Sequence, residues 1–239
     1  PDQSVLLVDT GGSVLHLDCG RQSGRSFAGL HYQASTAEGH DLFISAGSQI
    51  VLRSDEQELR RHEPHITGVD TPVAARVLRD GRWLVVGSNQ GGAAAAISDG
   101  VTWRHYPLPS LALSISHLGV LERANGEIWL GCAQEPREFT GITGGLAILR
   151  PMPDGTFTVE LRLPPVVPFR NWSLRESPKG DVVVGGMGLV SMTDRGYRAL
   201  PAPPVLQNKW IDQIAFDREG WIWAAAWSDG VFRQTAQGW

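Results

Sequence analysis

The stretch that decides the fold is Ile211–Trp239, which reads IDQIAFDREGWIWAAAWSDGVFRQTAQGW. Its glycines divide it into an alternating run (IDQIAFD), a turn (REG), an apolar run (WIWAAAW), a second turn (SDG) and a third run (VFRQTA). Short runs separated by tight turns in this way are typical of antiparallel strands. A sheet of three or four such strands leaves both faces exposed, so we expect further copies of the unit to cover it.

Copies of this unit recur along the chain in register. The glycine of the first turn recurs at spacings of 42, 45, 54 and 40 residues, and the glycine of the second turn is each time followed by a short apolar run. The first set is Gly39, Gly81, Gly126, Gly180 and Gly220, and the second set is Gly12, Gly47, Gly92, Gly145, Gly188 and Gly230. A period of about 44 residues with several strands in each period indicates a β-propeller. We therefore predict an all-β fold, a propeller of about six short four-stranded antiparallel blades.

The predicted blades are residues 1–26, 27–64, 72–109, 114–165, 169–204 and 210–239, within one propeller domain. The first lacks a clear outermost strand, because RQSGRS at 21–26 has the character of a connector, and the last stops where its outermost strand should begin. Two alternatives stay open. Either the two ends complete each other's sheet, or these residues are a segment of a larger, seven-bladed or double propeller.

Composition excludes some classes of function. The net charge of −4, with basic residues scattered along the chain, argues against a nucleic-acid-binding surface. No apolar run approaches the roughly 18 residues needed to cross a bilayer. The chain also lacks the G-x-S-x-G, H-E-x-x-H and G-x-x-x-x-G-K-[ST] motifs, so we predict no cofactor and no metal.

The units resemble the two-component regulator propeller repeat. The resemblance is carried by IDQIAFDREGWIWAAAWSDGVFR at 211–233, and by ISHLGVLERANGEIWLGCA followed by GGLAILR within 115–150. It implies a sensor region of a bacterial signalling protein such as a histidine kinase or diguanylate cyclase, placed in the periplasm or outside the cell. A small-molecule or glycan ligand, an output domain outside these residues and an association of two propellers would belong to such a protein.

In a propeller, the loops between second and third strands and the connections between blades gather at one face around the axis, where ligands bind. These segments here carry amides, a few charges and indoles, a mixture that suits stacking and hydrogen bonding to a sugar or a planar ligand. The swollen turn CAQEPREFTGITGG of the fourth unit adds to the same face, and a loop of that length favours function. The predicted ligand-binding residues are Asn89, Gln90, Gln134, Glu135, Arg137, Arg170, Trp172, Trp210 and Trp227.

An enzyme is the alternative to a binding module. The streptogramin-lyase family is similar in its G-x-[IL]-W strand and its ring of repeats, and this similarity implies a histidine base, an acid and magnesium. His31 and His117 fall on predicted first strands, which line the axis, so His117 is a weak catalytic candidate. A histidine packed among inner strands is the favoured interpretation of both. A secreted lectin or interaction scaffold is a further alternative.

Other aromatic and histidine residues have structural interpretations. We expect Trp83, Trp129 and Trp223 to pack between sheets, and Trp103 and Trp221 to be structural. His62 and His65 have a spacing that a metal could use, but Pro64 stands between them. Solvated loop histidines are therefore the favoured interpretation.

Overall fold

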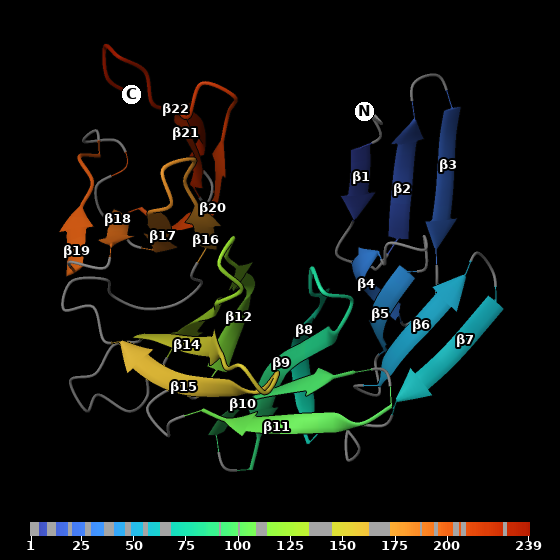
Figure 1. Cartoon of the computed structure of the whole chain (residues 1–239). Coiled ribbons are helices and arrows are strands. Elements are labelled where there is room, and N and C mark those ends of the chain that lie inside the picture. The colour runs from blue at the N-terminus through green and yellow to red at the C-terminus, as the bar shows by residue number, and fades with distance from the viewer. Residues whose placement is uncertain are drawn as a thin grey trace. The chain divides into compact units, whose positions relative to one another are not determined.

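The computed structural model (Figure 1) describes residues 5–8, 13–18, 21–26, 30–35, 41–45, 49–54, 57–62, 68–90, 92–99, 101–108, 114–133, 145–162, 173–186, 188–193, 196–202, 206, 209–226 and 229–239. These residues fold almost entirely into strands that pair antiparallel with their neighbours in sequence. No helix long and apolar enough to span a membrane occurs among them.

Six separate sheets are present in this part of the chain, each built from consecutive strands. The first three sheets are β1 (Val5–Val8), β2 (Ser13–Asp18) and β3 (Arg21–Ser26); β4 (Leu30–Ser35), β5 (Asp41–Ser45), β6 (Ile50–Ser54) and β7 (Gln57–His62); and β8 (Thr71–Val77), β9 (Trp83–Asn89), β10 (Gly92–Ser98) and β11 (Trp103–Pro107). The other three are β12 (Ser114–Glu122), β13 (Ile128–Ala133), β14 (Gly145–Pro151) and β15 (Phe157–Arg162); β16 (Ser173–Glu176), β17 (Val182–Gly186), β18 (Gly188–Thr193) and β19 (Gly196–Ala199); and β20 (Ile211–Phe216), β21 (Ile222–Ala226) and β22 (Gly230–Arg233).

Each sheet overlaps one predicted unit, although β8 begins at Thr71, one residue before the predicted third unit. The predicted all-β propeller fold is confirmed. Four sheets have four strands, whereas the first and last have three. One detail of the sequence prediction is wrong. Residues 21–26 form strand β3 and not a connector, because Arg21–Ser26 pairs along its whole length with Asp18–Ser13 of β2.

The turns between first and second strands explain why the glycine spacing located the sheets. In each described turn of this kind, the N–H of the first residue donates to the carbonyl four residues on, and the glycine N–H donates back to the first carbonyl, as Leu78 and Gly81 do at 2.7 and 2.9 Å. The glycine has φ between 81° and 86° in all four, a conformation that side chains disfavour. The predicted turn glycines Gly81, Gly126, Gly180 and Gly220 are thus confirmed, while Gly39 lies outside the described residues.

The chain separates into two compact units, residues 1–90 with 94–106, and residues 91–93 with 107–239. In the first unit, apolar side chains of the β4–β7 and β8–β11 sheets form a buried cluster that includes Trp83 and has Trp103 packed against it. In the second unit, one cluster joins the β12–β15 and β16–β19 sheets around Trp129, and another joins β16–β19 to β20–β22. Trp83, Trp103 and Trp129 are therefore packing residues, as predicted.

The contact of β16 and β17 with β20 shows how neighbouring sheets of the second unit fit together. Ser173 of β16 is opposite Gly185 of β17, and both touch β20. The buried Ser173 hydroxyl accepts a hydrogen bond from the Ile214 backbone N–H at 3.0 Å. A Cβ added to Gly185 would lie 3.0 Å from Cδ1 of Ile214, so glycine is what allows β20 to approach β17 here.

Candidate functional site

In one sheet of each compact unit, the described end of the second strand or the loop after it contacts the segment that leads into that sheet. In the first unit, the Asn89 amide nitrogen at the end of β9 donates to the carbonyl of Gly68, which precedes β8, at 3.3 Å. In the second unit, Lys209 before β20 pairs with Asp229 in the β21–β22 turn at 3.0 Å. We call this end of each sheet the loop end, and the opposite end, with the turns at Gly81, Gly126, Gly180 and Gly220, the turn end.

Three of the predicted ligand-binding residues lie within the described part of the chain. Asn89 and Gln90 are exposed together at the end of β9, and Trp210 is half-buried directly before β20 in the other unit. The remaining predicted residues, Gln134, Glu135, Arg137, Arg170, Trp172 and Trp227, lie outside the described residues. The ligand-binding role of the whole set stays a prediction.

The two histidines considered as catalytic candidates both lie on the first strand of a sheet, as expected. His31 is in β4 and His117 is in β12. The pairing of β12 with β13 jumps from Ile115 opposite Cys132 to Val120 opposite Leu130, so His117 falls in an irregular stretch with more residues than its partner. Irregularities of this kind redirect side chains locally and are common beside functional sites.

His62 is not a solvated loop residue, so that interpretation is wrong. It ends β7 and lies between two indoles, with ring centroids 5.7 Å from Trp83 and 5.4 Å from Trp103, both in edge-to-face geometry. Trp103 Nε1 donates a hydrogen bond to His62 Nδ1 at 3.4 Å. His65 lies outside the described residues, and the described part of the chain holds no group of three or more His, Cys, Asp or Glu side chains suited to a metal.

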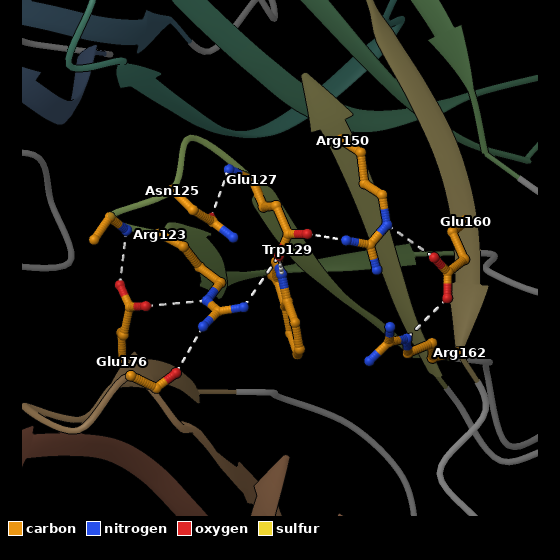
Figure 2. Close-up of polar contacts among 10 residues, drawn as sticks. Arg123, Asn125, Glu127, Trp129, Arg150, Glu160, Arg162 and Glu176 are labelled. Carbon is orange, nitrogen blue, oxygen red and sulfur yellow. Dashed lines mark hydrogen bonds and ion pairs between the residues drawn. The ribbon is translucent and has the colours of Figure 1, made fainter. Parts of the chain in front are cut away.

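An extensive polar cluster in the second unit surrounds Glu127, which is only 6% exposed (Figure 2). Its carboxylate accepts hydrogen bonds from Trp129 Nε1 at 2.9 Å, from Arg123 at 3.1 Å and from Arg150. Arg150 also pairs with Glu160 at 2.9 Å. The carboxylate can stay charged although it is buried, because two guanidinium groups and an indole N–H surround it.

The same cluster joins two sheets. Arg123, the first residue after β12, reaches Glu176 of β16 at 3.1 Å and the carbonyl of Gly180 at 2.6 Å. The Glu176 carboxylate in turn accepts the backbone N–H of Ala124 at 2.8 Å. The Arg123 guanidinium also lies 5.2 Å from the centre of the Trp129 ring, within cation–π range. Side chains up to 53 residues apart thus fasten the turn end of β12–β15 to that of β16–β19.

The protonation of Glu127 follows from these contacts. Burial alone would raise its pKa, but hydrogen bonds with Trp129, Asn125 and Arg123 and the charge of Arg150 outweigh it, and the pKa lies below its ordinary 4.5. The carboxylate is therefore ionised at neutral pH and has no proton to give. We assign the cluster a structural role and not that of a general acid.

A related arrangement recurs in the last sheet. Asp217 accepts hydrogen bonds from Trp223 Nε1 at 3.1 Å and from Arg233 at 2.6 Å. Despite some burial, these contacts and the Trp221 backbone N–H hold the Asp217 pKa at about 2. Trp223 itself is 38% exposed, so its prediction as a residue packed between sheets is wrong. A tryptophan three residues after the turn glycine, with a nearby acid, was the sequence signal common to both clusters.

The Asp212 carboxyl also has a shifted pKa. It lies on β20 where the pairing with β21 shifts between Ile211 and Gln213. Burial raises the pKa of this carboxyl above its ordinary 3.8, whereas the contacts described above lower those of Glu127 and Asp217. The sequence contains no pattern that predicts the raised pKa of Asp212, because burial of this carboxyl depends on residues that pack over β20 in the folded protein.

No family model matches the chain, and no curated protein sequence matches it. Among solved structures it is similar to PorZ, a surface component of the type-IX secretion system of Porphyromonas gingivalis (TM-score 0.69, 14% identity), covering 97% of this chain but 38% of that one. It is also similar to the extracellular domain of the putative hybrid two-component system BT3049 from B. thetaiotaomicron (TM-score 0.67, 12% identity, 96% of this chain and 31% of that one).

A third similar structure is a catalytically inactive virginiamycin B lyase from Staphylococcus aureus with quinupristin, with a TM-score of 0.65 and 15% identity. In this comparison 98% of this chain aligns with 81% of the lyase. At these identities the similarities establish the propeller fold. The chain spans well under half the length of PorZ and of the BT3049 domain.

Proposed function

We propose that this chain is the ligand-recognition part of a bacterial signalling protein, in the periplasm or outside the cell, and that a small molecule or glycan binds at the loop end. One observation carries the proposal. In each unit a second-to-third-strand loop and an incoming connection meet through polar contacts, Asn89 with Gly68 and Lys209 with Asp229. The similarity to extracellular domains of two-component and one-component systems supports the setting.

The loop end carries the chemistry that such a ligand needs. Asn89 and Gln90 present amides that donate and accept hydrogen bonds, and Trp210 presents an indole on which a sugar or planar ring can stack. The predicted residues Gln134, Glu135, Arg137, Arg170, Trp172 and Trp227 complete the proposed binding set. Signalling then requires an output domain that responds to altered blade packing or to an altered association of two propellers.

The direct test is isothermal titration calorimetry of the protein against a panel of glycans and metabolites. We expect a binder whose affinity falls about tenfold or more in Asn89→Ala and in Trp210→Ala, since each removes a direct contact. Arg104→Ala and Tyr197→Ala change an exposed cation on β11 and an exposed aromatic on β19, and should bind normally.

Circular dichroism melting would show that each variant folds, and Trp210→Phe keeps a stacking ring at the half-buried position. A panel without a binder, or equal losses in the test and control variants, contradicts the proposal. Sedimentation velocity with and without the ligand tests the association of two propellers.

A lyase-type enzyme is a second candidate, favoured by the position of His117 in the irregular part of β12 and by the similarity to virginiamycin B lyase. If the chain is such an enzyme, it should convert quinupristin in the presence of magnesium. Liquid chromatography of the reaction mixture would then detect the product. His117→Ala should abolish conversion while the melting temperature stays unchanged. An unaltered substrate after prolonged incubation with the wild-type protein removes this candidate.

A further inference from the structure

A crevice of about 430 Å³ opens at the turn end of the second unit, between the β16–β19 and β20–β22 sheets. Its volume lies within the range of small-molecule sites, roughly 300–1,000 Å³. Hairpin topology places first-to-second-strand turns and second-to-third-strand loops at opposite ends of a sheet. The crevice is therefore separate from the loop-end site proposed above.

One wall of the crevice is a row of side chains that crosses the β16–β19 sheet. Val183 of β17 is paired with Ser191 of β18, and Ser191 is paired with Arg198 of β19, so the three side chains lie on the same face. Val183 and Ser191 are each only 3% exposed, whereas Arg198 is exposed at the margin. This wall therefore has a buried apolar side chain and a buried hydroxyl at its base, and an exposed guanidinium at its margin.

The opposite wall comes from the β20–β21 turn and supplies flat aromatic surface. Phe216 and Trp221 are half-buried, and Ile222, the first residue of β21, is 6% exposed. The Trp221 backbone N–H donates to Asp217 at 2.8 Å, which fixes the turn that carries the ring. Two half-buried rings beside an apolar wall can hold a flat ligand body.

Positive charge prevails at the margin of the crevice. Lys179, Arg198 and Arg218 are exposed there, and none of them forms an ion pair with another residue in the part of the chain that the structure describes. Of the two carboxylates, Glu219 is paired with Arg233 at 3.2 Å, which leaves Asp181 against three cations. An anion is the ligand that this charge balance favours.

The crevice on the other side of the β16–β17 turn shows the contrast. It has about 460 Å³ and also borders Lys179 and Asp181, but its guanidinium is Arg123. Arg123 is already paired with Glu127 and Glu176 and lies over the Trp129 ring. An anion bound at Arg123 would compete with these ion pairs. Arg198 and Arg218 form no ion pair among the described residues, so an anion in their crevice meets no such competition.

We propose that the crevice between β16–β19 and β20–β22 binds a small organic carboxylate, with its carboxylate at Arg198 and Arg218 and its flat or apolar body against Phe216 and Trp221. The guanidinium groups bind the anion through paired N–H donors, and the rings exclude water from the ligand body. Both parts contribute, so neither a short carboxylate nor an uncharged ring should bind as well.

The test uses protein with ¹⁵N-labelled tryptophan, in which each indole N–H gives one resonance and Trp221→Phe identifies that of Trp221. Sodium benzoate, sodium acetate and benzamide are titrated in turn. We expect a saturable shift of the Trp221 resonance with benzoate, and a Kd about tenfold or more weaker for acetate and benzamide. Arg198→Gln and Arg218→Gln should each weaken benzoate binding by about tenfold, while the exposed Arg104→Gln on β11 leaves it unchanged.

Other results overturn the proposal. These are no shift at Trp221, equal shifts with benzoate and benzamide, or unchanged benzoate binding in both arginine variants. Spectra of the unliganded variants should superimpose on the wild type, which shows that the sheets still fold. Trp210→Ala at the loop end should leave benzoate binding intact. The crevice and the loop-end site are therefore tested separately, and a negative result at one does not decide the other.

Discussion

Replacement of Glu127 is the sharpest test of how the sheets of the second unit are fastened together. Three donors converge on its carboxylate, Trp129 Nε1 at 2.9 Å and the guanidinium groups of Arg123 and Arg150. A hydrogen bond to a charged group contributes about 1.5–3 kcal/mol to stability. When Glu127 is replaced, Arg123 still pairs with Glu176 and Arg150 still pairs with Glu160. The contacts of these two arginines with Glu127 therefore contribute at the low end of that range.

Two substitutions separate shape from charge. Glu127→Gln keeps an oxygen that can accept from Trp129 but removes the charge, and we expect it to lower the free energy of unfolding by about 2 kcal/mol. Glu127→Ala also leaves the buried indole N–H without this acceptor, and we expect a loss of about 4 kcal/mol, within the range for breaking a buried ion pair. Urea titration followed by tryptophan fluorescence at neutral pH measures both.

Asp80→Asn is the matched control, because Asp80 pairs with Arg82 at 2.7 Å but its side chain is 50% exposed. An exposed pair contributes about 0–1 kcal/mol, so the control should stay within that range. A Glu127→Gln variant as stable as the control would refute the argument that buried charge pairing joins these sheets.

The pH dependence provides an independent check on the same residue. The Glu127 pKa in the folded protein lies below its ordinary 4.5, so its contribution is fully present above that pH and is lost as the pH falls through the folded value. The stability difference between wild type and Glu127→Gln should therefore shrink as the pH is lowered from about 5 towards 3. A difference that stays constant over this range contradicts the assignment of an ionised carboxylate.

Three further predictions concern the same unit. Ser173→Ala should cost about 1–3 kcal/mol in urea titration because the buried Ile214 N–H loses its acceptor, and Ser173→Thr, which keeps the hydroxyl, should cost less. Gly185→Val should destabilise by about 1–3 kcal/mol or more, because its Cβ would crowd Ile214; a variant that melts with the wild type counts against this close packing. NMR titration of Asp217 should give a pKa of about 2, raised towards its ordinary 3.8 in Arg233→Gln, and an unchanged value in that variant would show that Arg233 is not the cause.

The sheet boundaries could be predicted because they depend on local chemistry. A turn closed by a glycine at positive φ needs that glycine whatever surrounds it, so Gly81, Gly126, Gly180 and Gly220 marked the hairpins directly. Strand β3 was missed because RQSGRS has no apolar alternation, and its pairing with β2 is not visible in the segment itself.

The contacts between sheets could not be predicted in the same way. Trp129 and Trp223 occupy the same position after their turn glycines, yet one is 2% exposed and the other 38%, because burial depends on which sheet lies over each. The Glu127 cluster draws on residues from four strands and a turn, and single-sequence patterns contain no signal for such distant partners. At the loop end, the meeting of loops and connections was predictable from topology, and Lys209 with Asp229 illustrates it.

The most direct test of the proposed recognition role is hydrogen–deuterium exchange of the protein with and without the tightest binder from the glycan and metabolite panel. We expect slower exchange at the loop end, in the segments around Asn89 and Trp210, with unchanged exchange in the turns at Gly126 and Gly180. Protection confined to those turns, or no protection at the loop end under saturating ligand, would contradict a binding site built from the converging loops.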